Sequence, residues 1–287
     1  MRGRRLRLGL DALLRGRGGF FIPYRHAHSV PPAGARGVYG AVETAFQAAR
    51  PAFAAHLAEI DRLGPALAAI GTDPPAAPRW GQDWFPRLDA AAAYAMVRRH
   101  RPRRILEVGS GHSTRFLARA VADGGLETEI TAIDPAPRAD IAGLRVRTVA
   151  ALVQDAPADL FAALAPGDFL MIDSSHVLMP GSDVDLLVNR VLPTLPPGVV
   201  VHFHDVFLPD DYPADWAWRA YNEQLALPAL LSGGYAPLFA SHYVATRMAG
   251  ELGASAAARL PLPEGARESS LWLRKAAPPA AAEGTKK

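Results

Sequence analysis

The feature that most constrains this chain is a short apolar strand that runs into a glycine turn and then into an amphipathic helix. Residues 105–108 are the apolar run, residues 109–111 (Gly-Ser-Gly) are the turn, and Ser113 or Thr114 can cap the helix. A second apolar run, EITAID, follows the helix and ends at Asp134. This order is typical of the opening β-α-β unit of a nucleotide-binding sheet.

Glu107 narrows the ligand that this turn can hold. A dinucleotide places its pyrophosphate beside such a turn, where the Glu107 carboxylate would repel it. S-adenosylmethionine (SAM) has no phosphate and carries two positive groups, so a nearby carboxylate attracts it. Thr114 also stands where the dinucleotide pattern has its third glycine. Asp134 lies 23 residues after Gly111, close to the spacing of the acid that accepts both ribose hydroxyls.

We therefore interpret the turn as a SAM site, against the alternative of an ordinary strand-turn-helix with a chance acid. The candidate cofactor-binding residues are Glu107, Gly109, Ser110, Gly111, Ser113, Thr114, Asp134 and Asp173. Gln154, after the third expected strand, is a candidate for approaching the adenine.

Composition excludes several classes of site. The 287 residues include no cysteine, so disulfides and thiolate metal sites are ruled out, and no apolar run approaches the length of a membrane span. We expect a cytoplasmic enzyme. The first residues are rich in arginine, a pattern that fits nucleic acid, anionic lipid or simply a solvated arm. No basic and aromatic stripe continues beyond them, so neither nucleic acid nor a membrane is expected as a partner.

The chain divides into three expected parts. Residues 1–79 are a basic arm followed by a helical extension, residues 80–275 the catalytic domain, and residues 276–287 a disordered tail. From residue 103 strands and helices alternate, which predicts an α/β fold with a doubly wound, Rossmann-like sheet. The last expected strands lie near residues 237–245 and 270–274.

Polar clusters follow two more strands. Asp173 and His176 come just after FLMI, and His204 and Asp205 end the run VVVHFHD. Ligands bind at the carboxyl ends of strands in an open parallel sheet, so these four candidate catalytic residues should open into the crevice that the glycine turn lines. His202 shares a strand face with His204 and is interpreted as structural.

Three interpretations of these clusters stay open. His204 or His176 can be a general base, because a pKa near 6.5 suits deprotonation of a hydroxyl. Alternatively, Asp173, His204 and Asp205 hold a divalent metal (Mg, Mn, Fe or Zn) that binds the acceptor oxygen, with His176 as a further ligand. In the third interpretation, these groups only bond to one another and shape the loops.

The motifs EVGSGHST and AID resemble those of class I SAM-dependent methyltransferases. The longer run from GDFLMIDSSH to HFHDVFLPDDYP resembles a bacterial subgroup, the methyltransferase-24-like family, over roughly residues 84–243. The resemblance implies a seven-stranded mixed sheet with one antiparallel strand, and contact of Glu107, Gly109, Gly111 and Asp134 with SAM. It also implies small-molecule or sugar acceptors, and related sugar O-methyltransferases use a divalent metal.

The sequence thus predicts a SAM-dependent methyltransferase that acts on a hydroxyl, with an amine less favoured, of a small molecule or sugar. The alternatives are a nicotinamide-dependent oxidoreductase on the same sheet and a SAM-binding protein without turnover. The expected partner is a small-molecule acceptor. The oligomeric state stays open, a homodimer included.

Overall fold

The computed structural model describes residues 2–15, 19–20, 22–71 and 73–277. They form two compact units, residues 1–36 and residues 37–287. The first unit contains α1 (Arg2–Arg15) and a short 3₁₀ turn, η1 (Ala27–Ser29). No helix in the described ranges is long and apolar enough to cross a membrane.

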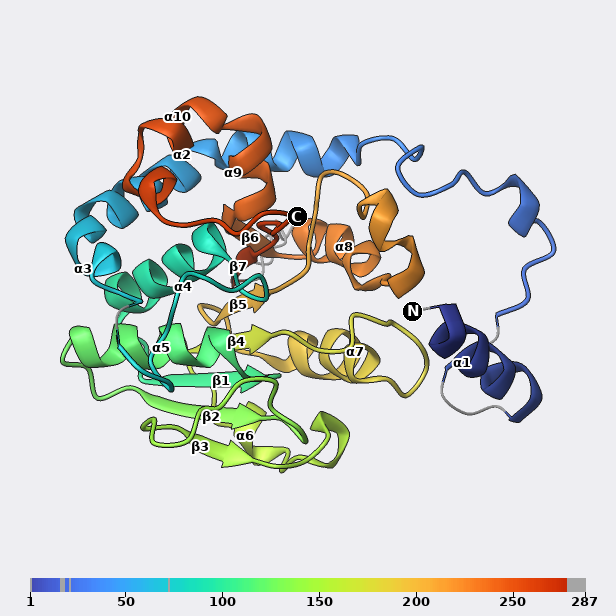
Figure 1. Cartoon of the computed structure of the whole chain (residues 1–287), viewed down its shortest axis with the longest axis horizontal. Coiled ribbons are helices and arrows are strands. Elements are labelled where there is room, and N and C mark those ends of the chain that lie inside the picture. Colours follow the sequence, from blue (N-terminus) through green and yellow to red (C-terminus); the bar gives the residue numbers. More distant parts are fainter. Residues whose placement is uncertain (1, 16–18, 21, 72, 278–287) are drawn as a thin grey trace, which may run out of the picture. The chain divides into compact units, whose positions relative to one another are not determined.

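The second unit is built on one seven-stranded sheet in the order β3-β2-β1-β4-β5-β7-β6, which Figure 1 shows from bottom to top. The strands are β1 (Arg104–Val108), β2 (Glu129–Ile133), β3 (Arg147–Val149), β4 (Phe169–Ile172), β5 (Val200–Phe203), β6 (Tyr235–Ala240) and β7 (Leu271–Lys275). The first five pair in parallel, and β7 lies antiparallel to both of its neighbours. The predicted mixed α/β sheet is confirmed.

Helices connect and cover these strands. They are α2 (Gly40–Arg62), α3 (Gly64–Ala68), α4 (Arg87–His100), α5 (His112–Asp123), α6 (Asp159–Ala162), α7 (Asp183–Leu186), α8 (Leu227–Ser232), α9 (Ser241–Arg247) and α10 (Ala249–Ala254). Short 3₁₀ or π turns join them, among them η5 (Ala214–Arg219) and η6 (Glu223–Ala226). The order of strands and helices puts the carboxyl ends of β1, β2, β4 and β5 at one edge of the sheet.

Helix α4 is buried from Leu88 to Val97, a stretch that is rich in alanine. Residues 90–93 are fully buried, and their small side chains let α4 lie close to both α2 and α5. The side chain of Glu268 accepts two hydrogen bonds from Arg87 and one from the Leu88 amide, which holds the first turn of α4. This anchoring fixes Asp89, the one acid of the helix, inside the protein.

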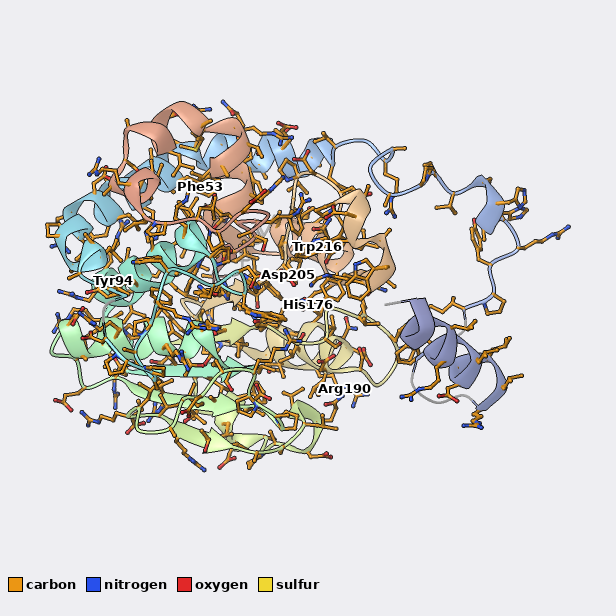
Figure 2. The ribbon with its side chains drawn as sticks, in the orientation of Figure 1. Phe53, Tyr94, His176, Arg190, Asp205 and Trp216 are labelled. Atoms are coloured by element: carbon orange, nitrogen blue, oxygen red, sulfur yellow. The ribbon has the colours of Figure 1, made fainter. Side chains whose placement is uncertain are left out.

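Helix α2 belongs to the same core as the sheet. Phe53 of α2 packs edge-on against Phe239 of β6 and Tyr243 of α9, and Figure 2 labels Phe53 and Tyr94 among the core side chains. The sequence interpretation grouped residues 1–79 as one extension. In the structure, residues 37–79 fall in the compact unit of the sheet, because the apolar stripe of α2 is buried on β6 and α4.

Several predicted elements are shorter or different in the structure. The strand expected over residues 237–245 is wrong after Ala240, where α9 begins. Residues 214–232 do not form one continuous helix, because Ala220 adopts a left-handed conformation (φ 54°) that ends η5. The expected tail lies mostly outside the described residues; residues 276 and 277 are exposed coil.

Candidate active site

The turn after β1 requires glycine at its first position. Gly109 has φ +81°, and a Cβ atom there would lie 2.0 Å from the carbonyl oxygen of Asp173. Such a distance is far inside van der Waals contact, so a side chain at Gly109 would push the ends of β1 and β4 apart. The turn therefore brings the backbone of the two strands together at the place where a ligand would bind.

Asp134, at the end of β2, is tied to this turn. One carboxylate oxygen accepts hydrogen bonds from the Ser110 amide (2.7 Å) and the Ser110 hydroxyl (3.0 Å). The other accepts from the Ala136 amide at 2.8 Å. The carboxylate is thus held at the mouth of the crevice, in a position to accept hydroxyl hydrogen bonds from a ligand.

Glu107 lies beneath the turn and is almost fully buried. Its two oxygens accept hydrogen bonds from the hydroxyls of Ser113 and Thr114, both at 2.6 Å. Burial raises the pKa of Glu107 to about 7, although these two hydrogen bonds oppose the shift. Among the residues that the structure describes, no cationic side chain forms a hydrogen bond or ion pair with this carboxylate. A positively charged ligand above the turn would therefore supply its missing counter-charge.

A cleft of about 250 Å³ opens above the turn. Four predicted cofactor-binding residues line it: Gly109, Ser110, Asp134 and Asp173. The other four, Glu107, Gly111, Ser113 and Thr114, lie outside its lining and form the support below it. Gln154 also lines the cleft, as do Ala136, Arg138, Leu152, Val153, Ser174 and Asp183, which the sequence interpretation did not select.

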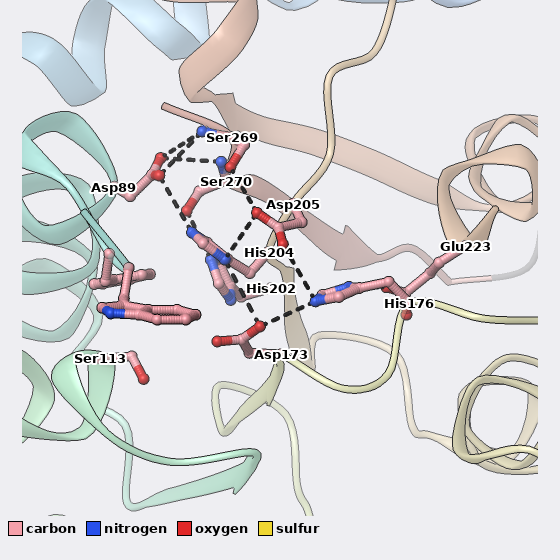
Figure 3. A network of polar contacts seen from close by, with 12 residues as sticks. Asp89, Ser113, Asp173, His176, His202, His204, Asp205, Glu223, Ser269 and Ser270 are labelled. Atoms are coloured by element: carbon pink, nitrogen blue, oxygen red, sulfur yellow. Dashed lines mark hydrogen bonds and ion pairs between the residues drawn. The ribbon is translucent and has the colours of Figure 1, made fainter. Parts of the chain in front are cut away.

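The polar clusters that follow β4 and β5 meet in space. The His176 Nε2 atom lies 3.2 Å from Asp173 Oδ1 and 3.4 Å from Asp205 Oδ2. The His204 Nδ1 atom lies 3.7 Å from Asp173 Oδ1 and 3.5 Å from Asp205 Oδ1. Figure 3 shows the four side chains closing a ring. The structure therefore brings together all four of the predicted catalytic residues.

Two further carboxylates, which the sequence interpretation missed as site residues, hold the outer nitrogens of the imidazoles. Asp89 Oδ2 lies 3.3 Å from His204 Nε2, and Glu223 Oε2 lies 2.8 Å from His176 Nδ1. Asp89 also accepts hydrogen bonds from the Ser269 and Ser270 amides. Both acids are almost fully buried, so each fixes the orientation of its imidazole.

Imidazoles and carboxylates of this network shift the pKa values of His176, His204, Asp173 and Asp89. Burial lowers the pKa of both histidines, but the surrounding carboxylates outweigh it and raise the pKa of His176 and His204 well above 6.5. Burial likewise raises the pKa of Asp173 and Asp89, and the imidazoles outweigh it in the opposite direction. The sequence expectation of a histidine pKa near 6.5 is thus wrong, because carboxylates surround each imidazole and raise its pKa.

The backbone is left-handed at two of these residues. His176 has φ 60° and Asp205 has φ 55°, a region that residues other than glycine rarely adopt. Such strain of about 1–3 kcal/mol per residue persists where the surroundings over-determine it, often at functional sites. Here it turns both side chains inward, toward the ring that Figure 3 shows.

A smaller pocket of about 80 Å³ adjoins the cleft. Asp173 and Arg138 line both spaces. The remaining lining residues of the smaller pocket are Asp83, Trp84, His204, Asp205, Trp216 and Arg219. The Arg219 guanidinium stacks 3.9 Å above the Trp216 ring, and Arg138 lies 4.8 Å above Trp84. Figure 2 labels Trp216 beside Asp205.

The chemistry of Asp173, His204 and Asp205 suits a divalent metal, but their arrangement does not. The donor atoms of these residues face and pair with one another. Among the described residues, no group of three or more His, Cys, Asp or Glu side chains could hold a metal ion as it stands. We therefore derive no metal-dependent step from this geometry, and the metal of the sequence analysis stays a prediction.

His202 lies next to the ring but does not join it. Its Nε2 atom is 2.9 Å from the Ser270 hydroxyl, and its ring packs 4.6 Å from that of Trp272. Burial lowers the pKa of His202 to about 3, so this imidazole is neutral. Its contacts agree with the structural role expected from the sequence.

Comparison with known protein families gives a match over part of the chain. A family model described as a methyltransferase domain, that of the methyltransferase-24 family, matches residues 106–206. This segment begins in β1 and ends one residue beyond Asp205, so it contains the turn and the ends of β2, β4 and β5. A search of curated protein sequences gave no significant match.

Solved structures with a similar chain path are also methyltransferases. The SAH-bound methyltransferase PaMTH1 of Podospora anserina is 17% identical, with 90% of this chain and 99% of that chain covered and a TM-score of 0.39. An O-methyltransferase from Bacillus cereus in complex with SAH is 14% identical, with 77% and 90% covered and a TM-score of 0.37. The methyltransferase MycE of the mycinamycin pathway, in complex with Mg and SAH, is 18% identical, with 67% and 50% covered and a TM-score of 0.37.

These TM-scores lie below 0.5, so the assignment rests on the matched segment and not on these structures. The segment carries the glycine turn, the buried acid before it and the acid after β2, on the sheet described above. A methyltransferase match over these residues also disfavours the nicotinamide-dependent alternative. Residues 106–206 of this SAM-dependent methyltransferase therefore match the methyltransferase domain of the methyltransferase-24 family.

Proposed function

We propose that this enzyme transfers the methyl group of SAM to a hydroxyl of a small molecule, with sugars among the candidate acceptors. The observation that carries the proposal is an imidazole held by a buried acid at the wall of a pocket. His204 lines the small pocket, and Asp89 holds its far nitrogen. That pocket shares Asp173 with the cleft above the glycine turn, so acceptor and cofactor would meet there.

SAM would lie in the cleft, with its ribose at Asp134. Its sulfonium would lie near Asp173, the acid common to both spaces, and its charge would also be favoured by Glu107 beneath the turn. The Asp173 side chain is 33% exposed, so the carboxylate is accessible from the cleft. A carboxylate near a sulfonium is attractive in a partly buried site, where water screens the charges less than in solution.

The chemical step is a direct displacement at the methyl carbon. The acceptor oxygen forms a bond to the methyl carbon while the carbon–sulfur bond breaks, and its electron pair stays on sulfur to give SAH. The hydroxyl proton moves to Nδ1 of His204, which faces the pocket, while Nε2 keeps its proton toward Asp89. The enzyme supplies mainly the alignment of the two reactants and this base.

A base of this kind favours a hydroxyl over an amine. A neutral amine already has a free electron pair, so it needs no base to attack the methyl group, whereas an alcohol must lose its proton. Five of the six ionisable groups are buried and therefore costly to desolvate, and a purely structural network could be replaced by apolar side chains. The network is therefore best explained as proton-accepting machinery.

The raised pKa of His204 sets a condition on this role. Only neutral His204 can accept a proton, so its proton must leave before methyl transfer. The positive charge of bound SAM works in this direction, since a cation near an imidazolium lowers its pKa. Cofactor binding would thus prepare the base at the moment when the acceptor can react.

A first experiment tests the cofactor and the acceptor class. Calorimetric titration with SAM, SAH and NAD should show binding of SAM and SAH and none of NAD. Incubation with methyl-labelled SAM and matched pairs of alcohols, phenols, sugars and amines should give oxygen-methylated products by mass spectrometry. Methylation of amines alone would overturn the hydroxyl proposal, and SAM binding without any product would favour the SAM-binding protein without turnover.

A second experiment separates the imidazole base from the metal. If His204 acts as the base without a metal ion, enzyme that has been treated with a chelator and dialysed should keep its activity. If the activity needs a divalent ion bound by these side chains, it should be lost with the chelator and return when Mg, Mn, Fe or Zn is added. The second result would contradict the base mechanism and would make Asp173, His204 and Asp205 metal ligands.

A further inference from the structure

Residues 1–36 differ from the rest of the chain in charge. They contain eight arginines and a single acid, Asp11, which gives a formal charge of +7. The whole chain carries +3, so residues 37–287 together carry −4. Such an asymmetry between segments is an electrostatic signature of a segment that binds an anionic surface.

The same unit buries none of its described residues. Large apolar side chains on it are exposed, and they include those of α1 and of the segment after it: Leu6, Leu10, Leu13, Leu14, Phe20, Ile22 and Tyr24, each between 46% and 74%. A unit without a core gains no stability from packing these groups within itself. Their exposure therefore points to an apolar environment outside the unit.

The exposed leucines of α1 lie on one face of the helix. Leu6, Leu10, Leu13 and Leu14 recur at helical spacing and share one face of α1, which is labelled in Figure 1. Asp11 and Arg15 form an ion pair on the other side of the helix. An arginine-rich helix with one apolar face can lie in a membrane interface, with its leucines at the acyl boundary and its arginines at the headgroups.

We propose that residues 1–36 hold the enzyme on an anionic lipid surface by laying α1 in the headgroup region. The charge alone would also fit nucleic acid, whose phosphates attract arginine. The exposed leucine face decides between the two, because phosphate contacts make no use of it. The proposal departs from the sequence expectation of no membrane partner, and it is independent of the acceptor chemistry proposed above.

The test is binding of the full-length protein to vesicles, measured by co-sedimentation. Vesicles of phosphatidylcholine alone are compared with equimolar phosphatidylcholine and phosphatidylglycerol. We expect binding to the anionic vesicles only, with an affinity that falls as salt is raised. Absence of binding to the anionic vesicles at low salt would overturn the proposal.

Neutral substitutions test the leucine face without changing the charge. Leu10→Gln and Leu13→Gln should each weaken vesicle binding by about tenfold, because an apolar side chain no longer enters the interface. Leu262→Gln is the matched control, since Leu262 is an exposed leucine (40%) of the other unit and should have no effect. Arg7→Gln should weaken binding by about fivefold, and Arg190→Gln should not.

Nucleic acid as the partner of residues 1–36 would give different binding results. If nucleic acid is the partner, a duplex oligonucleotide binds more tightly than the vesicles, and Leu10→Gln and Leu13→Gln leave its affinity unchanged. Either of these two results would overturn the lipid proposal. All five variants should bind SAM like the unmodified protein, because none of the substituted residues lines the cleft.

Discussion

The two halves of the site use buried acids in opposite ways. Below the cofactor turn, Glu107 has only hydroxyl partners, and burial raises its pKa to about 7. In the ring at the acceptor pocket, Asp89 and Asp173 have imidazole partners, and the pKa of each falls despite burial. Glu223 differs from these two acids, because burial keeps its pKa raised although His176 is its partner. Glu107 in the cofactor half thus lacks a cationic partner until a ligand binds, whereas the acids of the acceptor half are already paired with His176 and His204.

The largest effect on activity is expected when the proposed base of the acceptor half is removed. His204→Gln should lower the rate of methyl transfer by about 10²–10⁴-fold, because the acceptor hydroxyl keeps its proton. The affinity for SAM should change little, since His204 lines the small pocket and not the cleft. Single-turnover rates with labelled SAM, together with calorimetric affinities, measure both.

His202→Gln is the matched control for that variant. His202 lies in β5, two residues before His204. Its ring is 6.1 Å from that of His204, and it lines neither space. A thermal melt of each variant shows whether the fold is kept. Equal loss of activity in both variants at equal stability would contradict a specific role for His204.

The cofactor half is tested at the glycine turn. Gly109→Ala should abolish measurable SAM binding and destabilise the protein by more than the ~1–3 kcal/mol of left-handed strain, because the new methyl group overlaps the Asp173 carbonyl. Gly125→Ala is the control, since Gly125 also has positive φ (+54°) but nothing lies within 4 Å of the added atom. Similar losses of stability in both variants would mean that strain, and not the close approach of β1 and β4, is the cause.

The charge of Glu107 gives a smaller effect that depends on pH. Binding of cationic SAM favours the ionised acid, so the affinity for SAM should rise as the pH is raised through about 7. We expect a change of up to about tenfold across the titration and release of protons on binding below pH 7. Glu107→Gln should remove the part of this pH dependence that is centred near pH 7. A wild-type affinity that is flat with pH, or that falls, would show that Glu107 does not sense the cofactor charge.

The difference between the halves also explains what the sequence could predict. The strand, turn and helix at residues 105–121 and Asp134 form a nearly continuous motif with local periodicity, and the structure has the strands and the helix there. The ends of β4 and β5 could be placed together by the rule for parallel sheets. In both cases short segments and one topological rule were sufficient.

The other features of the site depend on contacts between distant parts of the chain, which local sequence patterns do not determine. Asp89 is 115 residues from His204, and Glu223 is 47 residues from His176. One signal was available for Asp89, since it is the only acid in the alanine-rich run of α4 and a lone acid on a buried helix needs a partner. Glu223 follows a broken helix whose left-handed residue, Ala220, has no sequence signature. The raised pKa of His204 follows only when Asp89 is known beside Asp173 and Asp205.

The pH dependence of methyl transfer by the wild-type enzyme and by Asp89→Asn tests the central claim most directly. Single-turnover rates with saturating SAM should rise with pH as His204 loses its proton, with a midpoint above 6.5. Asp89→Asn keeps the shape but removes a charge that raises this pKa, so its midpoint should move to lower pH and its maximal rate should fall. A profile that does not depend on pH, or one that Asp89→Asn leaves in place, would contradict the account of His204 as the base.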